Sequence, residues 1–183
     1  MNDITQDLLL ELNNKLLDFK FRKCSSRANV LQKNDAFYSA FCLGIIFMWA
    51  GKGEKSGQRY GNSLLTECKK YNELLVQSKE LLNSYDPNFE CTTIQYNKNY
   101  KIAKHIDANN VGESYILGLG NYTGGELIVY DKNDSPTYID INHKFYKFNG
   151  SELYHETASY IGDRITLVFF KLGEKHNNMK KKI

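Results

Sequence analysis

The stretch YKIAKHIDANN, residues 100–110, places a histidine and an aspartate one residue apart. In a β-strand, residues i and i+2 point to the same face, so the side chains of His105 and Asp107 are expected to converge. The chain has only 4 histidines, and this pair suits either two ligands of one metal ion or a simple His–Asp hydrogen bond. The pair alone leaves both interpretations open, and the rest of the chain has to decide between them.

The composition is that of an ordinary globular protein, with 183 residues, 42% of them hydrophobic and 25% charged. A chain of this length can bury a core without disulfide or metal cross-links. The formal net charge of +3 is compatible with a polyanionic partner but does not by itself indicate one. The 4 cysteines show no CxxC spacing, which predicts reduced thiols in an intracellular protein.

Signals for export or membrane insertion are not visible in the sequence. The N-terminal run MNDITQDLLLELNNKLL carries acids where a signal peptide needs positive charge. The longest apolar run, residues 36–50, is shorter than a membrane span of roughly 20 residues. We therefore expect a soluble protein of the cytoplasm or nucleus that is not secreted and has no membrane partner.

The first half of the chain has mainly helical patterns. Leucines recur at helical spacing in residues 3–18, and apolar residues do so in residues 63–84. Residues 36–50 are expected to begin as a helix and pass into a strand. Residues 51–63 are polar and rich in glycine but lack the GK[ST] ending of a phosphate-binding loop, so a lid or substrate loop is expected there.

From residue 90 onward, short runs rich in β-branched and aromatic residues alternate with Gly, Asn and Asp. This pattern predicts an antiparallel sandwich or barrel, and the jelly roll is one such architecture. The fold class is therefore α+β, mainly β, with helices in front of the sheets. The expected strands are CTTIQYNKN, YKIAKHID, SYILGLG, GELIVYD, PTYIDI, KFYKFNG and RITLVFFK.

The stretch LYHETASYIGDRITLVFF supplies a second histidine, His155, followed nine residues later by Arg164. Two histidines and one carboxylate can form a facial triad that leaves coordination positions of Fe(II) open for a cosubstrate and O₂. The planar fork of an arginine matches a carboxylate. His143 is the rival third ligand, but it lies in a charged run far before the strand-borne arginine and is expected at the surface. His176 lies in the basic tail and is expected to be solvated.

Taken in order, His105-x-Asp107, TGGELIVYD, FNGSELYHET and Arg164 resemble the Fe(II)/2-oxoglutarate-dependent dioxygenases. The resemblance covers roughly residues 90–172. It implies a double-stranded β-helix, or jelly-roll, core with the N-terminal helices packed on it. It also implies that His105, Asp107 and His155 bind iron, with no catalytic side chain beyond this metal site.

The same resemblance implies the remaining parts of the site. Arg164 is expected to bind the far carboxylate of 2-oxoglutarate, Tyr96 to help hold that cosubstrate, and Thr166 to add a weaker contact. The cofactors are then Fe(II), 2-oxoglutarate and O₂, with ascorbate in support. A single domain spanning residues 1–183 is expected, made of helical support and a loop (1–89), the jelly-roll core (90–172) and a basic tail (173–183).

The substrate remains open between two classes of macromolecule. The prolyl-hydroxylase style of the last strands favours a protein side chain. The net positive charge, the Lys/Arg-containing loop at residues 52–59 and the basic tail slightly favour a nucleic-acid base, as in AlkB-type and TET/JBP-type oxygenases. A third alternative is a jelly-roll binding module without catalytic activity, which the complete triad disfavours.

Overall fold

The computed structural model describes residues 3–22, 39–50 and 57–173, with the side chains of all of these except residues 47–50 and 57–60. Its elements follow in chain order: α1 Asp3–Asp18, β1 Ser39–Ala50, β2 Gly57–Asn62, the 3₁₀ turn η3 Leu64–Glu67, α2 Lys69–Tyr85, β3 Thr93–Lys98, β4 Ser114–Gly124, β5 Leu127–Tyr130, β6 Pro136–Ile139, β7 Phe145–Phe148, β8 His155–Thr157 and β9 Tyr160–Phe170.

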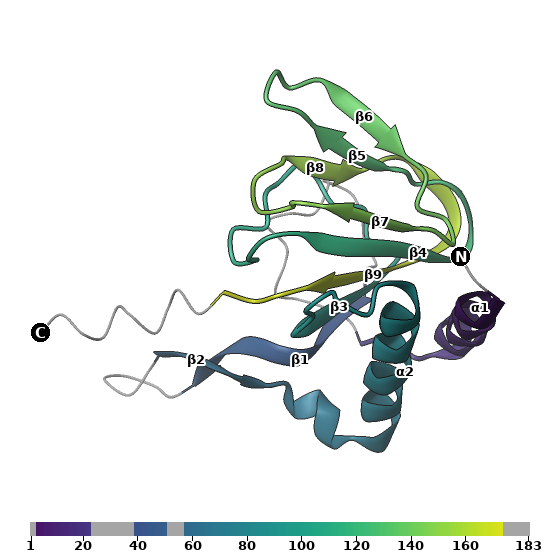
Figure 1. The fold of residues 1–183 in the computed structure, drawn as a ribbon, viewed down its shortest axis with the longest axis vertical. Helices are drawn as coiled ribbons and strands as arrows, with labels where there is room; N and C mark the ends of the chain where they lie inside the picture. Colours follow the sequence, from purple (N-terminus) through teal and green to yellow (C-terminus); the bar gives the residue numbers. More distant parts are fainter. Residues whose placement is uncertain (1–2, 23–38, 51–56, 174–183) are drawn as a thin grey trace, which may run out of the picture.

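The strands form two antiparallel sheets, and two helices lie beside the larger one (Figure 1). The larger sheet has six strands in the order β2-β1-β3-β9-β4-β7, and the smaller has three in the order β6-β5-β8. The architecture is thus α+β and mainly β, as the sequence predicts. Among the residues described, no helix is both long and apolar enough to cross a membrane.

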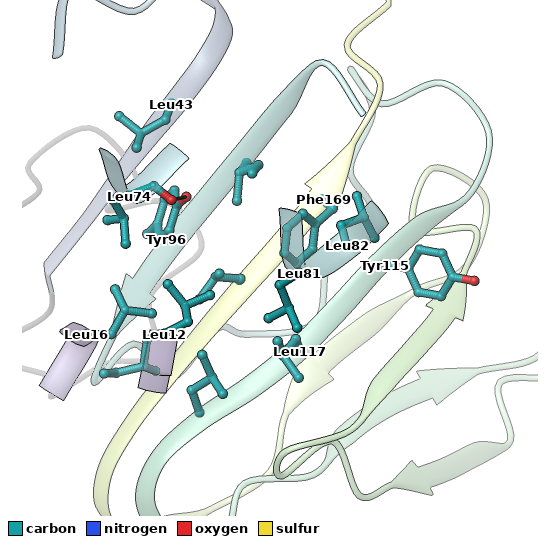
Figure 2. Packing of buried hydrophobic residues seen from close by; sticks show 14 of the residues in the cluster. Leu12, Leu16, Leu43, Leu74, Leu81, Leu82, Tyr96, Tyr115, Leu117 and Phe169 are labelled. Carbon is teal, nitrogen blue, oxygen red and sulfur yellow. Dashed lines mark hydrogen bonds between the residues drawn. The ribbon is translucent and has the colours of Figure 1, made fainter. Parts of the chain in front are cut away.

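The helices cover one face of the six-stranded sheet and complete the main hydrophobic core with it. Leu9, Leu12 and Leu16 of α1 recur at helical spacing and are almost fully buried. They meet buried side chains from α2 and from the central strands, shown in Figure 2. Burying each such leucine contributes roughly 1.5–3 kcal/mol of transfer free energy, which anchors both helices to the sheet.

The opposite face of the six-stranded sheet lines a cavity. In β9, Ile165, Leu167 and Phe169 belong to the helix-side core. The alternate residues Arg164, Thr166, Val168 and Phe170 line the cavity. The two-residue period of the strand therefore separates an apolar core from a site that carries polar groups.

Three stretches differ from the sequence-based expectation. Residues 39–50 form one continuous strand, without the helical start expected for residues 36–50, because β1 pairs with β2 and with β3 along its length. Part of the expected loop at 51–63 is β2, and residues 51–56 lie outside the described chain. The expected strand at 100–107 is irregular and makes only isolated bridges.

Candidate metal and cosubstrate site

His105, Asp107 and His155 come together where the irregular segment after β3 meets the start of β8. His105 and His155 exchange two backbone hydrogen bonds, each of 3.0 Å, as an isolated antiparallel bridge. The amide of Asp107 donates to the carbonyl oxygen of Gly150 at 2.8 Å. These long-range backbone bonds, rather than a regular strand, place the three side chains on one spot.

The three side chains offer ligand atoms that all lie within 4.8 Å of one another. The Nε2 atom of His105 lies 3.5 Å from Oδ1 of Asp107, and that of His155 lies 3.7 Å from Oδ2 of Asp107. The imidazole ring centroids are 4.2 Å apart. All three side chains are buried or half-buried, so a bound cation would be largely shielded from water.

Both imidazoles are held in the tautomer that suits a metal ligand. Nδ1 of His105 lies 2.8 Å from the carbonyl oxygen of Ala103, and Nδ1 of His155 lies 3.0 Å from that of Leu153. A carbonyl oxygen only accepts, so each Nδ1 carries a hydrogen and Nε2 is the nitrogen left to bind a metal. Such outer contacts orient metal-binding histidines, and this donor set fits a divalent first-row metal such as Fe(II).

Three further residues restrain or enclose Asp107 and the ring of His155. The Nδ2 atom of Asn110 donates to Oδ2 of Asp107 at 3.2 Å, which restrains the carboxylate. Gly150 lies so close that an added Cβ would sit 3.3 Å from Oδ2 of Asp107 and 3.3 Å from Cε1 of His155. Phe148 packs edge-on against the His155 ring at 5.0 Å between centroids. The triad is therefore tightly enclosed on its protein side.

Arg164 carries a buried charge on the wall of the same cavity. Only 3% of the residue is exposed, and burial lowers the pKa of its guanidinium from the ordinary value. Its Nε donates to the carbonyl oxygen of Gly125 at 3.0 Å. Among the described residues no carboxylate makes an ion pair with it. An arginine remains protonated when buried, so this cavity favours an anion.

Two hydroxyl groups lie near this arginine. Thr166 follows two residues later on β9, is 2% exposed and lines the cavity. Tyr122, on β4, has a buried hydroxyl that interacts with the guanidinium of Arg164 without reaching the geometry of a full hydrogen bond. That hydroxyl lies over Gly118, which pairs directly with Thr166 across the sheet. Burial raises the pKa of Tyr122 and the charge of Arg164 partly offsets this, so the hydroxyl stays neutral and able to donate.

Tyr96 does not lie with these residues, although the sequence suggested that it helps to hold the cosubstrate. It points to the helix side of the sheet, next to Leu74 in Figure 2. It is fully buried, stacks on Phe41 at 4.8 Å between centroids, and donates its hydroxyl to Ser78 on α2 at 2.8 Å. The alternate residues of β3, which are Thr93, Gln95 and Asn97, face the cavity instead.

His143, the third histidine of the described residues, is not part of the triad. His143 is half-buried in the turn before β7, where its backbone amide donates to the carbonyl oxygen of Gly118. It therefore lies deeper than the surface position expected from the sequence, and burial lowers its pKa. His176 lies outside the described residues.

Gly125, Gly150 and Tyr122 were not singled out as site residues from the sequence. A GG pair such as that at 124–125 is typical of a turn, and Gly125 does have a φ of +71°. Its second role is spatial, because an added Cβ would lie 2.8 Å from Nε of Arg164. The sequence signal for this role was the pair Gly124–Gly125, whose missing side chains leave room for a neighbouring large side chain such as that of Arg164. Nothing local in the sequence marks Tyr122 among the 13 tyrosines.

The cavity that joins these groups has a volume of about 330 Å³. Its apolar walls include Ile116, Leu127, Phe148 and Val168, between the two sheets. The triad and Arg164 both open onto it. A small anion held by the arginine can therefore share the cavity with a metal held by the triad.

Comparison with known proteins relates this arrangement to solved structures. An oxidoreductase of the 2OG-Fe(II) oxygenase family from Burkholderia pseudomallei matches with a TM-score of 0.58 and 15% identity, over 88% of this chain and 77% of that one. A prolyl hydroxylase from Trichoplax adhaerens, solved with a hypoxia-inducible-factor peptide fragment, matches with a TM-score of 0.56 and 14% identity, over 99% of this chain and 83% of that one. This chain has the fold of the 2OG-Fe(II) oxygenases.

The same fold similarity extends to NgTET1 in complex with 5mC DNA, with a TM-score of 0.53 and 15% identity over 91% of this chain and 68% of that one. No protein-family model matches the sequence, and no curated protein matches it. The similarity therefore lies in the fold, and the activity has to be argued from the site.

Proposed function

We propose that this protein is an Fe(II)- and 2-oxoglutarate-dependent dioxygenase that hydroxylates a macromolecular substrate, with a nucleic-acid base favoured. The observation that carries the proposal is one cavity bearing both the His105–Asp107–His155 triad and the buried Arg164. We infer that the strands of residues 90–172 form the two sides of a jelly-roll core, that β1 and β2 extend its larger sheet, and that the chain forms one domain.

The triad is suited to hold Fe(II) through the Nε2 atoms of two imidazoles and one carboxylate, because both Nδ1 atoms are engaged with backbone carbonyl oxygens. Bound Fe(II) would supply the redox chemistry by which O₂ converts 2-oxoglutarate to succinate and CO₂ and places one oxygen atom in a substrate C–H bond as a hydroxyl. Ascorbate would support activity as a reductant.

The other side chains bind and orient the cosubstrate. Arg164 neutralises the far carboxylate of 2-oxoglutarate in a dry pocket, where a charge-assisted hydrogen bond is strongest. Thr166 and Tyr122 add hydroxyl donors beside it. The apolar walls formed by Ile116 and Val168 keep water from the reacting end.

The lining favours a substrate whose reacting part is uncharged. Apart from the triad, the charged side chains on the cavity, among the residues that the structure describes, are Arg164 and Glu156, and Glu156 accepts a hydrogen bond from Tyr130. Asn109, an exposed amide on the lining, is a residue type that can pair with base edges. With the net charge of +3, this supports a nucleic-acid base. The fold similarity to prolyl hydroxylases supports a prolyl-type protein substrate as the second candidate.

The test is succinate formation by the purified protein with Fe(II), ascorbate and 2-oxoglutarate, offered double-stranded DNA, RNA or a proline-rich peptide pool in turn. We expect stimulation above the substrate-free rate by a nucleic acid. Stimulation by the peptides alone would establish the second candidate. Arg164→Met should lose the activity at low 2-oxoglutarate, with Lys101→Met as the matched control at a half-buried cation outside the cavity lining. Absence of succinate under every condition would refute the oxygenase assignment.

A further inference from the structure

A chain of buried polar side chains crosses the cavity-facing side of the sheet and ends beside Arg164. Gln95 and Asn97 lie on β3, and Thr166 lies opposite Asn97 on β9. All three are buried, with 7%, 2% and 2% of their surfaces exposed, and all three line the cavity. Burying polar groups is costly unless each is hydrogen-bonded, so the bonds of this chain determine its geometry.

The backbone fixes the orientation of the first amide. Nε2 of Gln95 lies 3.3 Å from the carbonyl oxygen of Phe41 and 3.1 Å from that of Tyr96. Carbonyl oxygens only accept, so the atom facing both of them must be the NH₂ nitrogen. The other end of the amide, Oε1, accepts from the thiol of Cys42 at 2.7 Å.

The second amide is oriented by the first. Nε2 of Gln95 also donates to Oδ1 of Asn97 at 3.0 Å. The Asn97 oxygen is therefore turned toward Gln95, and its NH₂ group is turned toward Thr166. Nδ2 of Asn97 donates to Oγ1 of Thr166 at 3.2 Å. Each hydrogen bond thus runs in one direction, from Gln95 to Asn97 to Thr166.

This direction determines what Thr166 can do. Its hydroxyl oxygen accepts from Asn97, and no described residue accepts its own hydrogen. The hydroxyl is therefore left as a donor on the cavity wall, two residues from a guanidinium that has no carboxylate partner in the described chain. Two donors side by side favour an anion and disfavour a group that brings N–H donors of its own.

We propose that Asn97 is a positioning residue that makes Thr166 an obligate hydrogen-bond donor to the far carboxylate of the cosubstrate. This rests on the proposed function, in which that carboxylate is paired with Arg164. Gln95 fixes the orientation of the Asn97 amide, and Asn97 donates to the Thr166 hydroxyl. Thr166 then donates its own hydrogen to the carboxylate. The arrangement selects a dicarboxylate over an analogue that ends in an amide.

The experiment measures binding of 2-oxoglutarate to the Mn(II)-loaded protein by calorimetry, without O₂ and without turnover. Asn97→Ala and Thr166→Val should each weaken binding about tenfold, the loss of one hydrogen bond to a charged group. The double variant should bind no more weakly than Thr166→Val alone, because Asn97 acts through Thr166. Mn(II) affinity, measured in parallel, should equal that of the wild type in all three variants.

Three results would separate the possibilities. If the wild type binds 2-oxoglutarate but Asn97→Ala binds equally well, or if the two losses multiply, the role of Asn97 is refuted and the proposed function stands. If the Mn(II)-loaded wild type does not bind 2-oxoglutarate, the proposed function fails and this inference with it. Should Asn97→Ala not fold, the isosteric Asn97→Asp replaces it. Its carboxylate would take the Thr166 hydrogen and add a negative charge, weakening binding about 100-fold.

Discussion

Replacing Gly150 by alanine should weaken metal binding while leaving the fold nearly as stable as before. The added Cβ would lie 3.3 Å from Oδ2 of Asp107 and 3.3 Å from Cε1 of His155, whereas ordinary van der Waals contact begins at 3.4 Å. Both ligands must then shift by tenths of an ångström. Changes that displace metal ligands in this way cost about 10–100-fold in affinity, or about 1.4–2.7 kcal/mol.

The stability of the metal-free protein is subject to two opposing effects in this variant. Alanine restricts the unfolded chain and so stabilises by about 0.4–1 kcal/mol, and the crowding costs about as much or slightly more. Gly112→Ala is the matched control, since nothing lies within 4 Å of its added Cβ but its φ is +70°. That substitution should cost about 1–2 kcal/mol of unfolding free energy without changing the metal affinity.

The assay pairs Mn(II) titration by calorimetry with urea unfolding in the presence of a chelator. Gly150→Ala should lose metal affinity and keep its unfolding midpoint, and Gly112→Ala should show the reverse. Wild-type Mn(II) affinity in Gly150→Ala would refute the inference that these three side chains form the metal site. A large loss of stability with unchanged affinity would do the same.

Three further predictions follow from buried polar groups. Tyr96→Phe removes the 2.8 Å hydrogen bond to Ser78 and should lower the unfolding free energy by about 1 kcal/mol in urea titrations, without changing 2-oxoglutarate affinity. Tyr122→Phe removes a hydroxyl that interacts with Arg164 and should change the unfolding free energy by less than about 1 kcal/mol, yet weaken 2-oxoglutarate binding about tenfold in calorimetry. Burial lowers the pKa of His143 below the ordinary value of 6.5, so the unfolded state binds more protons and stability should fall as the pH drops through that value. His143→Asn, which tolerates the φ of 55°, should reduce this dependence in urea unfolding at pH 7 and pH 5.5.

The sequence was most informative where a strand separates an apolar face from a polar one. In β9, Arg164 and Thr166 stand out from the apolar residues that alternate with them, and the structure places both on the cavity wall. The two-residue period alone predicts that they share a face. The run RITLVFF carries apolar residues on both faces, which suits its place as a central strand between β3 and β4.

β3 shows where such reasoning fails. Its first five residues are all buried, so burial does not separate its two faces, and only the family resemblance suggests that Tyr96 holds the cosubstrate. The helix-side face takes the larger apolar ring because α2 offers both a packing surface and the hydroxyl of Ser78. Gln95 and Asn97 can face the cavity because each satisfies the other, a tertiary condition that is not visible in the sequence of one strand.

The triad was predicted correctly as a cluster but for an incomplete local reason. His105 and Asp107 do not lie on a strand, and they converge because residue 105 bridges residue 155 across the fold. Yet both imidazoles are fixed by the same local contact, to the carbonyl oxygen two residues earlier, at Ala103 and at Leu153. Any residue supplies that carbonyl, so the contact leaves no signature in the sequence. The identity of the ligands is therefore readable from side chains, whereas their orientation depends on backbone conformation that only the folded chain defines.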